Sequence, residues 1–197
     1  AKPVLEGILI SSDEDNLILS ANNLEYAIEC KIPADIREEG SVVFDSKILY
    51  DIIKTLPNGE IDFDVAENLV TRIKCNQSVY DIMGLDPSDF PELPVIRENS
   101  SLKIEPEILK GMIRQTIHAV SVKTENPVLT GTLFEIENNV LTLVSLDRFK
   151  LAKRKESLSS PSENAKFIVP AKTLSEILRI LPDDEQMTEI LVTDKYV

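Results

Sequence analysis

Short runs of branched apolar residues, separated by turn-forming residues, predict β-strands along much of the chain. Residues 5–10 and 16–20 flank a Ser-Asp-Glu-Asp stretch and predict a hairpin. Further strands are predicted at residues 24–32, 61–65, 69–75, 78–83, 102–104, 149–154, 166–169 and 189–193. Because each run is short and ends at a turn, we expect antiparallel sheets.

Three segments place apolar residues at i, i+3 and i+4, which is the spacing of an amphipathic helix. In the first of them, Ile48, Leu49 and Ile52 follow Ser46, the expected N-cap, and Pro57 ends the run. The three predicted helices cover residues 46–56, 107–120 and 171–181. Together with the strands they predict an α+β fold.

The chain contains two copies of one unit. At an offset of 124 residues, the segment 3–19 matches 127–143 with seven identities among seventeen positions, and both begin with Pro-Val-Leu-x-Gly. One inserted residue then aligns 44–57 with 169–182, which places a helix in each copy. The repeat predicts two domains, residues 1–100 and 101–197.

Neither copy is complete when the two are aligned. In the alignment Val197 corresponds to about Val70, so the second copy lacks the counterpart of residues 71–96. The first copy lacks the counterpart of residues 101–125. We therefore expect the chain to be part of a longer repeat protein, in which each complete unit has two helices and several strands.

Composition and charge narrow the class of protein. Hydrophobic residues make up 43% of the chain, which suffices for packed cores, and no apolar run is long enough to span a membrane. No signal peptide is recognised, and Cys30 and Cys75 lack metal-type spacing, so we expect a reducing cytoplasm. The net charge of −13 argues against bulk affinity for nucleic acid but allows one locally basic face.

No catalytic constellation is found in the sequence. The single histidine, His118, lies on the polar side of a predicted helix, where a plain surface role is expected. The carboxylates are scattered over turns and helix surfaces, and the six glycines form no phosphate-binding loop. We expect a protein that is not an enzyme and that needs no metal or cofactor; a hydrolase using surface carboxylates has no support in the sequence.

Each predicted helix carries basic residues opposite its apolar stripe. The repeat gives Lys47, Asp51 and Lys54 the same positions as Lys172, Glu176 and Arg179, and the middle helix has Lys110, Arg114 and His118. One interpretation is an ordinary solvated face with i, i+4 ion pairs. The other is a set of helices that meets a phosphate backbone without reading bases. The pattern alone leaves both open.

Four motifs follow one another in order along the chain: the Pro-x-Leu-x-Gly opening, Asp89-Phe90-Pro91, a Leu-Asp-x-x-x-Leu-Ala box at 146–152, and a Val-Pro-x-x-x-Leu helix start at 169–174. Their order, spacing and repetition resemble the family of bacterial sliding clamps, the beta subunit of DNA polymerase III. The resemblance covers the whole chain, from inside the first clamp domain to inside the second.

This resemblance implies the DNA-clamp fold, with repeated domains that have antiparallel sheets outside and two helices per complete domain inside. It also implies three domains per protomer and a head-to-tail homodimer that closes a ring around double-stranded DNA. The helices would line the hole. Residues expected to face the duplex are Lys47, Lys54, Lys110, Arg114, Lys172 and Arg179, together with Lys123, which lies in a loop where the family places a polar DNA contact.

The resemblance further implies a docking pocket for short peptides of the polymerase III catalytic subunit, the clamp loader and other proteins with clamp-binding motifs. The family's Thr-Asp-x-His-Arg-Leu sequence aligns with residues 146–151, and the remaining pocket walls are expected beyond Val197. The expected pocket residues are Leu146, Arg148, Phe149, Lys150 and Leu151, of which Leu146, Phe149 and Lys150 depart from the family pattern. Two alternatives stay open: these residues only end a strand and its turn, or the protein is a peptide-docking scaffold that does not bind DNA.

Overall fold

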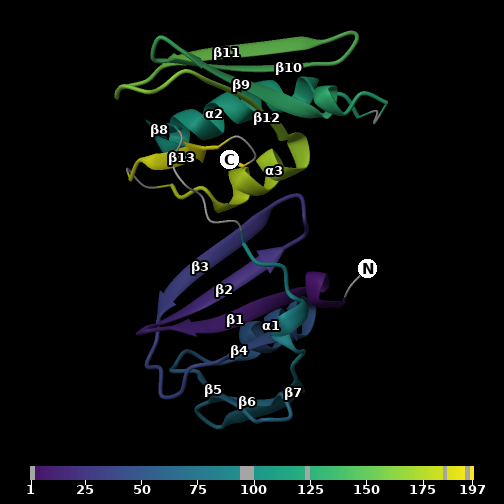
Figure 1. Ribbon diagram of the computed structural model, residues 1–197, viewed down its shortest axis with the longest axis vertical. Coiled ribbons are helices and arrows are strands. Elements are labelled where there is room, and N and C mark those ends of the chain that lie inside the picture. The colour runs from purple at the N-terminus through teal and green to yellow at the C-terminus, as the bar shows by residue number, and fades with distance from the viewer. Residues whose placement is uncertain (1–2, 94–99, 123–124, 184–185, 194–195) are drawn as a thin grey trace. The chain divides into compact units, whose positions relative to one another are not determined.

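The computed structural model describes residues 3–93, 100–122, 125–183, 186–193 and 196–197. The chain forms two compact units, Ala1–Pro94 (unit 1) and Val95–Val197 (unit 2). Each unit combines antiparallel sheets with helices, as Figure 1 shows.

Unit 1 contains two antiparallel sheets and one α-helix. One sheet has the strand order β3-β2-β1-β4 and the other β5-β6-β7. The α-helix, α1 (Ser46–Thr55), follows β4 directly. The strands are β1 (Gly7–Asp13), β2 (Asn16–Asn22), β3 (Ala27–Pro33), β4 (Ser41–Asp45), β5 (Asp62–Val65), β6 (Val70–Cys75) and β7 (Ser78–Met83), and short 3-10 turns cover Pro3–Glu6 and Pro87–Asp89.

Unit 2 has a four-stranded sheet of order β11-β10-β9-β12 and a two-stranded sheet of β13 and β8. Its α-helices are α2 (Pro106–Thr116) and α3 (Ala171–Ile180), and 3-10 turns cover Ile117–Ala119 and Pro127–Thr130. The strands are β8 (Ser100–Ile104), β9 (Gly131–Glu137), β10 (Val140–Leu146), β11 (Leu151–Ser157), β12 (Ala165–Pro170) and β13 (Thr188–Val192).

The repeat found in the sequence is visible in the strand pairing. In unit 1, Leu9 pairs with Ser20 on one side and with Val43 on the other. In unit 2, Leu133 pairs in the same way with Val144 and Ile168. These pairs differ by the offsets of 124 and 125 that align the sequences, so both copies form the same sheet in the same register.

The helices cover one face of each four-stranded sheet. In unit 2, Met112 and Ile113 of α2 and Leu174 of α3 are buried with Phe134 and Leu143 of the sheet. In unit 1, Leu49 of α1 is buried with Phe44 and Ile73. Because side chains alternate across a strand, the opposite face of each sheet points away from the helices.

The shared glycine of the two openings allows a neighbouring strand to approach closely. A Cβ atom added to Gly131 would lie 2.6 Å from Cγ2 of Ile168 and 2.7 Å from the carbonyl oxygen of Val169. The same addition at Gly7 would lie 2.5 Å from Cγ1 of Val43. A side chain therefore does not fit at either position, which explains why both copies carry glycine there.

Several local predictions were wrong. The N-cap of α1 is Asp45, not Ser46, because the Asp45 side chain accepts a hydrogen bond from the backbone N–H of Ile48 at 2.8 Å. The strand predicted at 149–154 begins only at Leu151, and β4 (Ser41–Asp45) was not predicted. The helix predicted at 107–120 ends at Thr116 and continues as a 3-10 turn. The other helices and strands were confirmed within three residues at their ends.

Candidate functional site

Two predicted DNA-facing residues lie exposed on α1. Lys47 and Lys54 are on the side of the helix opposite the buried Leu49. The Lys54 ammonium lies 5.6 Å from the centre of the Tyr50 ring, where a cation is attracted by the aromatic face. Ile48, which the spacing places in the apolar stripe, is 52% exposed. The outward side of α1 therefore mixes two basic groups with apolar surface.

The counterpart residues on α3 are exposed as well. Lys172 and Arg179 lie on the helix opposite Leu174, which is fully buried. The Arg179 guanidinium donates to both carboxylate oxygens of Glu176 at 3.0 Å. This pair reduces the net positive charge of α3 without removing the cation from the surface.

Lys110, on α2, does not lie on an exposed basic stripe. Its side chain is buried, with only 3% of the residue exposed, and its ammonium donates to the carbonyl oxygen of Pro182 at 3.1 Å and to the Asp183 carboxylate. The hydrogen bond from Lys110, and then its charge, lower the pKa of Asp183. The expectation that Lys110 faces DNA is corrected: this lysine joins α2 to the segment that follows α3.

The other residues predicted on the middle helix have different surroundings. Arg114 is exposed on α2, and its charge also contributes to the lowered pKa of Asp183. His118 is exposed in the 3-10 turn that follows the helix. Lys123 lies outside the described residues.

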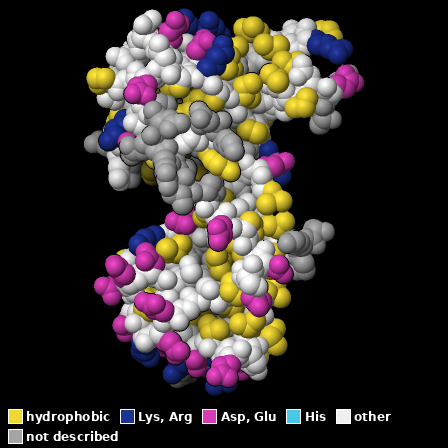
Figure 2. All heavy atoms as spheres, viewed as in Figure 1, with side chains coloured by type: hydrophobic (Ala, Val, Ile, Leu, Met, Phe, Trp, Pro, Cys, Tyr) yellow, Lys and Arg dark blue, Asp and Glu magenta, His cyan; other side chains and the backbone are white. Residues whose placement is uncertain are grey.

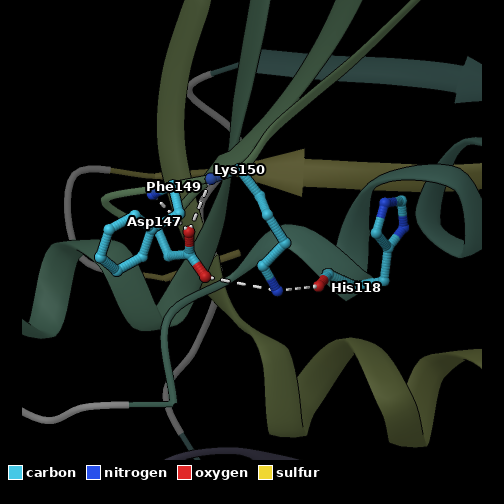
Figure 3. Close-up of polar contacts among 4 residues, drawn as sticks. All are labelled: His118, Asp147, Phe149 and Lys150. Carbon is cyan, nitrogen blue, oxygen red and sulfur yellow. Dashed lines mark hydrogen bonds and ion pairs between the residues drawn. The ribbon is translucent and has the colours of Figure 1, made fainter.

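Residues 146–151 form a tight turn between β10 and β11, organised by Asp147 (Figure 3). One Asp147 carboxylate oxygen accepts the backbone N–H groups of Phe149 at 2.8 Å and Lys150 at 2.7 Å. The Asp147 N–H donates to the carbonyl oxygen of Lys150 at 3.0 Å, which closes the turn. The hydrogen bond from Phe149, followed by those from Lys150 and the Lys150 charge, lowers the pKa of Asp147. The turn is thus held by a carboxylate that is ionised at neutral pH.

The Lys150 side chain fastens this turn to the 3-10 turn after α2. Its ammonium lies 3.3 Å from the second Asp147 carboxylate oxygen and donates to the carbonyl oxygen of His118 at 3.1 Å (Figure 3). Lys150 therefore has a structural role in addition to the predicted role in peptide binding. Arg148 points elsewhere and lies 3.5 Å from the Glu125 carboxylate.

The same turn leaves its apolar side chains in solvent. Phe149 is 93% exposed, and Leu146 and Leu151, which pair with each other across β10 and β11, are also exposed. Exposed large apolar groups that lie together are typical of interaction sites. The sequence predicted these residues as pocket residues but did not predict the role of Asp147. An Asp side chain that accepts the backbone N–H two residues further on is a known feature of such turns.

None of the helices in the part of the chain that the structure describes is long and apolar enough to cross a membrane. Within the same residues, no three His, Cys, Asp or Glu side chains group closely enough to hold a metal ion.

Comparison with protein families gives two matches that together cover both units. Residues 1–94 match the N-terminal domain of the DNA polymerase III beta subunit, and residues 103–197 match its central domain. The chain is 36% identical to the beta sliding clamp of Halalkalibacterium halodurans over 98% of its own length and 53% of the relative's. It is 30% identical to the beta sliding clamp of Bacillus subtilis over 99% of its length and 54% of the relative's.

Solved structures agree with these matches. The crystal structure of the Bacillus subtilis DNA polymerase sliding clamp superposes with a TM-score of 0.93 and 30% identity, over 98% of this chain and 53% of that one. The DNA polymerase III subunit beta of Pseudomonas aeruginosa gives 0.91 and 27% over the same shares. The chain spans about half the length of the curated relatives it matches. The predicted resemblance and clamp fold are confirmed, and the chain belongs to the family of the DNA polymerase III beta subunit, the beta sliding clamp.

Proposed function

We propose that the chain is part of a DNA sliding clamp, an accessory protein without catalytic activity that holds the replicative polymerase on double-stranded DNA. The observation that carries this proposal is the match of both units, in order, to two domains of proteins named beta sliding clamp. The whole protein would form a homodimeric ring in the cytoplasm. Residues 1–100 and 101–197 would belong to its first and second domains, and its partners would be the polymerase III catalytic subunit and the clamp loader.

DNA contact is proposed for the basic residues that remain exposed on the helices. Lys47 and Lys54 on α1, Arg114 on α2, and Lys172 and Arg179 on α3 can each approach a phosphate, whereas Lys110 cannot. Such contacts would be independent of base sequence, because they involve only the backbone charge. They would also be weak, since a ring is retained on DNA by its topology and needs little affinity.

Neutralising the helix cations should weaken DNA binding and reduce its dependence on salt. In a variant with Lys47, Lys54, Lys172 and Arg179 all changed to Gln, we expect the slope of log K against log salt to fall by about 2 to 4, because each phosphate contact contributes about 0.9. Fluorescence anisotropy with a short duplex at low salt measures this slope.

A charge-matched control separates local contact from net charge. Changing Lys31, Lys74, Lys103 and Arg37 to Gln removes the same four charges from strands and a loop that carry no predicted DNA contact. The control should keep most of the slope. Equal slopes in the two variants would favour the alternative function, a peptide-docking scaffold that does not bind DNA.

Peptide docking is proposed at Leu146, Arg148, Phe149, Lys150 and Leu151. Peptide sites gain affinity from a few apolar anchors within a polar rim. The turn held by Asp147 offers both: Phe149 and Leu151 are exposed apolar groups, and Arg148 is an exposed cation that could meet an acidic or carbonyl group. The fixed backbone of the turn lowers the ordering cost of binding.

Leu151→Asp should abolish the binding of polymerase-derived peptides, with at least a tenfold loss of affinity, because it places a carboxylate in the apolar wall. Calorimetry on the full-length protein measures the effect, since the chain spans about half the length of its relatives. Leu24→Asp is the matched control, because Leu24 is an exposed leucine of unit 1. Unchanged affinity in the Leu151 variant would refute this location of the site.

A further inference from the structure

The loop between α1 and β5 contains the single Asn-Gly pair of the chain. Asn58 and Gly59 follow Pro57, and none of the other asparagines precedes a glycine. Both residues are exposed, and both lie outside the helices and strands of unit 1. In an Asn-Gly pair the backbone nitrogen of the glycine can attack the side-chain amide carbon of the asparagine, because glycine has no Cβ atom to obstruct the approach. The loop therefore has the sequence and the exposure that this reaction needs.

The attacking nitrogen is free to react. Within the residues that the structure describes, the N–H of Gly59 donates no hydrogen bond. The loop is held through its carbonyl groups instead: Sγ of Cys75 donates to the carbonyl oxygen of Pro57 at 3.3 Å, and Nδ2 of Asn76 donates to that of Asn58 at 3.4 Å. These contacts attach the loop to the end of β6 and leave the nitrogen of Gly59 open to attack the neighbouring amide.

The side-chain amide of Asn58 is free as well. Several other asparagine side chains are held by backbone N–H groups. Asn23 accepts two of them at 2.9 Å in the turn after β2, and Asn139 accepts one at 2.9 Å in the turn after β9. In the described part of the chain the Asn58 side chain has no such bond, so its amide can rotate towards the nitrogen that follows it.

Unit 2 shows that a carboxylate fits at this position of the fold. The repeat aligns Asn58 with Asp183, which also comes directly after a Leu-Pro pair at the end of a helix. Asp183 accepts a hydrogen bond from Lys110 of α2, yet 88% of its side chain is exposed. The position therefore stays open to solvent where a second helix contacts the loop.

We propose that Asn58 is a site of spontaneous deamidation, a modification that needs only water. The nitrogen of Gly59 attacks Cγ of Asn58 and forms a C–N bond, and the side-chain amide leaves as ammonia with the proton that the Gly59 nitrogen gives up. Water then opens the cyclic imide: its hydroxyl joins one carbonyl carbon and its proton returns to the nitrogen. Attack at the side-chain carbonyl gives aspartate at position 58, and attack at the backbone carbonyl gives isoaspartate.

Either product places a new carboxylate just beyond the C-terminal end of α1. The net charge of −13 becomes more negative by one, on a unit over whose surface Asp and Glu side chains are already spread (Figure 2). A negative charge at this end of a helix opposes the helix dipole. Isoaspartate also lengthens the main chain by one carbon atom. Deamidation therefore weakens the end of α1, and it does so whether or not the protein binds DNA or peptides.

Peptide mass spectrometry on the 197-residue chain, incubated at mildly alkaline pH, tests the proposal. We expect the segment 55–72 to gain the mass difference between a hydroxyl and an amino group, with fragmentation locating the change at Asn58 and not at Asn68. The rate should rise with pH, because the attacking nitrogen must lose its proton. The chain unfolded in urea should react at Asn58 at a similar rate, since the folded loop leaves both reacting groups free.

Variants at the same loop separate this reaction from general decay. Gly59→Ala should slow the change about tenfold, which corresponds to about 1.4 kcal/mol in the activation free energy. Gly59 has no positive φ, and an added Cβ atom would lie 3.0 Å from the end of the exposed Asn76 side chain, which can move aside. Gly40→Ala is the matched control, because an added Cβ atom meets nothing within 4 Å there, and it should react as the parent chain does.

Three results would overturn the proposal: an intact Asn58 in the folded chain under conditions that modify it in urea, a similar rate of change at the other asparagines, or an unchanged rate in Gly59→Ala. Asn58→Gln provides a further check, because its longer side chain would have to close a larger ring, and it should stay unmodified. None of these measurements involves DNA or a docking peptide, so their outcome is independent of the proposed function.

Discussion

Lys110→Glu is expected to lower the free energy of unfolding of unit 2 by about 3 to 5 kcal/mol, the cost typical of leaving an uncompensated charge at a buried position. The parent side chain is buried and donates to Pro182 and Asp183. Glutamate would bury a carboxylate beside the carbonyl oxygen of Pro182 and the carboxylate of Asp183, and both of these groups accept hydrogen bonds rather than donate them. Urea unfolding followed through NMR signals of unit 2 measures the loss without assuming that both units unfold together.

Lys110→Met is the control for this prediction, because methionine keeps most of the volume and removes the charge and the hydrogen bonds that the ammonium donates, without burying a new charge. It should cost about 1 kcal/mol, the value of one lost hydrogen bond at Pro182. The methionine variant should also lose part of the acid sensitivity of unit 2. The pKa of Asp183 is lowered in the folded state, so its contribution is present above the ordinary Asp pKa and is lost as the pH falls through the folded value. A glutamate variant as stable as the parent would contradict the burial of Lys110 and support the original expectation that this residue is exposed and faces DNA.

The error at Lys110 shows what a helical pattern cannot predict. Lys110, Arg114 and His118 recur every four residues, but each step rotates the side chain by about 40°, so the first and third differ by about 80° around the helix. Helix spacing alone cannot say which part of that arc a neighbouring segment covers. Here the residues after α3 cover Lys110 and leave Arg114 and His118 exposed. The two residues that Lys110 contacts, Pro182 and Asp183, lie 72 and 73 residues further along the chain.

The turn at 146–151 could be located from the sequence, but its conformation could not. Apolar and basic residues continue from Phe149 into β11, which favours a strand from 149 onward. In the structure, the Asp147 carboxylate binds two successive N–H groups and removes Phe149 and Lys150 from the ladder. This competition between a side-chain acceptor and strand pairing involves only neighbouring residues. Asp147 is therefore the residue from which the turn could have been predicted.

Strand β4 could have been predicted by applying the repeat more fully. Its five residues, Ser41–Asp45, are too short to be distinctive alone, yet the aligned segment 166–169 was predicted as a strand. The core was easier to predict, because Leu49, Met112, Ile113 and Leu174 lie at helical spacing and are all buried, although Ile48 in the same stripe as Leu49 is exposed. The sequence did not predict which residues share the face of the β9–β12 sheet that points away from the helices, since that depends on the register of four separate strands.

Gly131→Ala should be among the most destabilising single-methyl changes in unit 2. The added Cβ would lie 2.7 Å from a backbone oxygen and 2.6 Å from Ile168, and backbone atoms of a paired strand cannot move aside cheaply. The backbone conformation at Gly131, with φ −123°, is open to alanine, so the clash is the sole obstacle. We expect a loss of about 2 to 3 kcal/mol in the free energy of unfolding, the range found for overpacked cores.

Gly111→Ala is the control in the same unit, and its expected effect on the free energy of unfolding has the opposite sign. Gly111 lies inside α2, and a Cβ atom added there meets nothing within 4 Å. Alanine should therefore stabilise unit 2 by about 1 kcal/mol, the difference in helix propensity between the two residues. Urea unfolding of both variants, followed at the same unit 2 NMR signals, should move the midpoints in opposite directions. A Gly131 variant that unfolds with the parent chain would mean that β9 and β12 can separate at this point, which would remove the explanation for the glycine in both copies of the repeat.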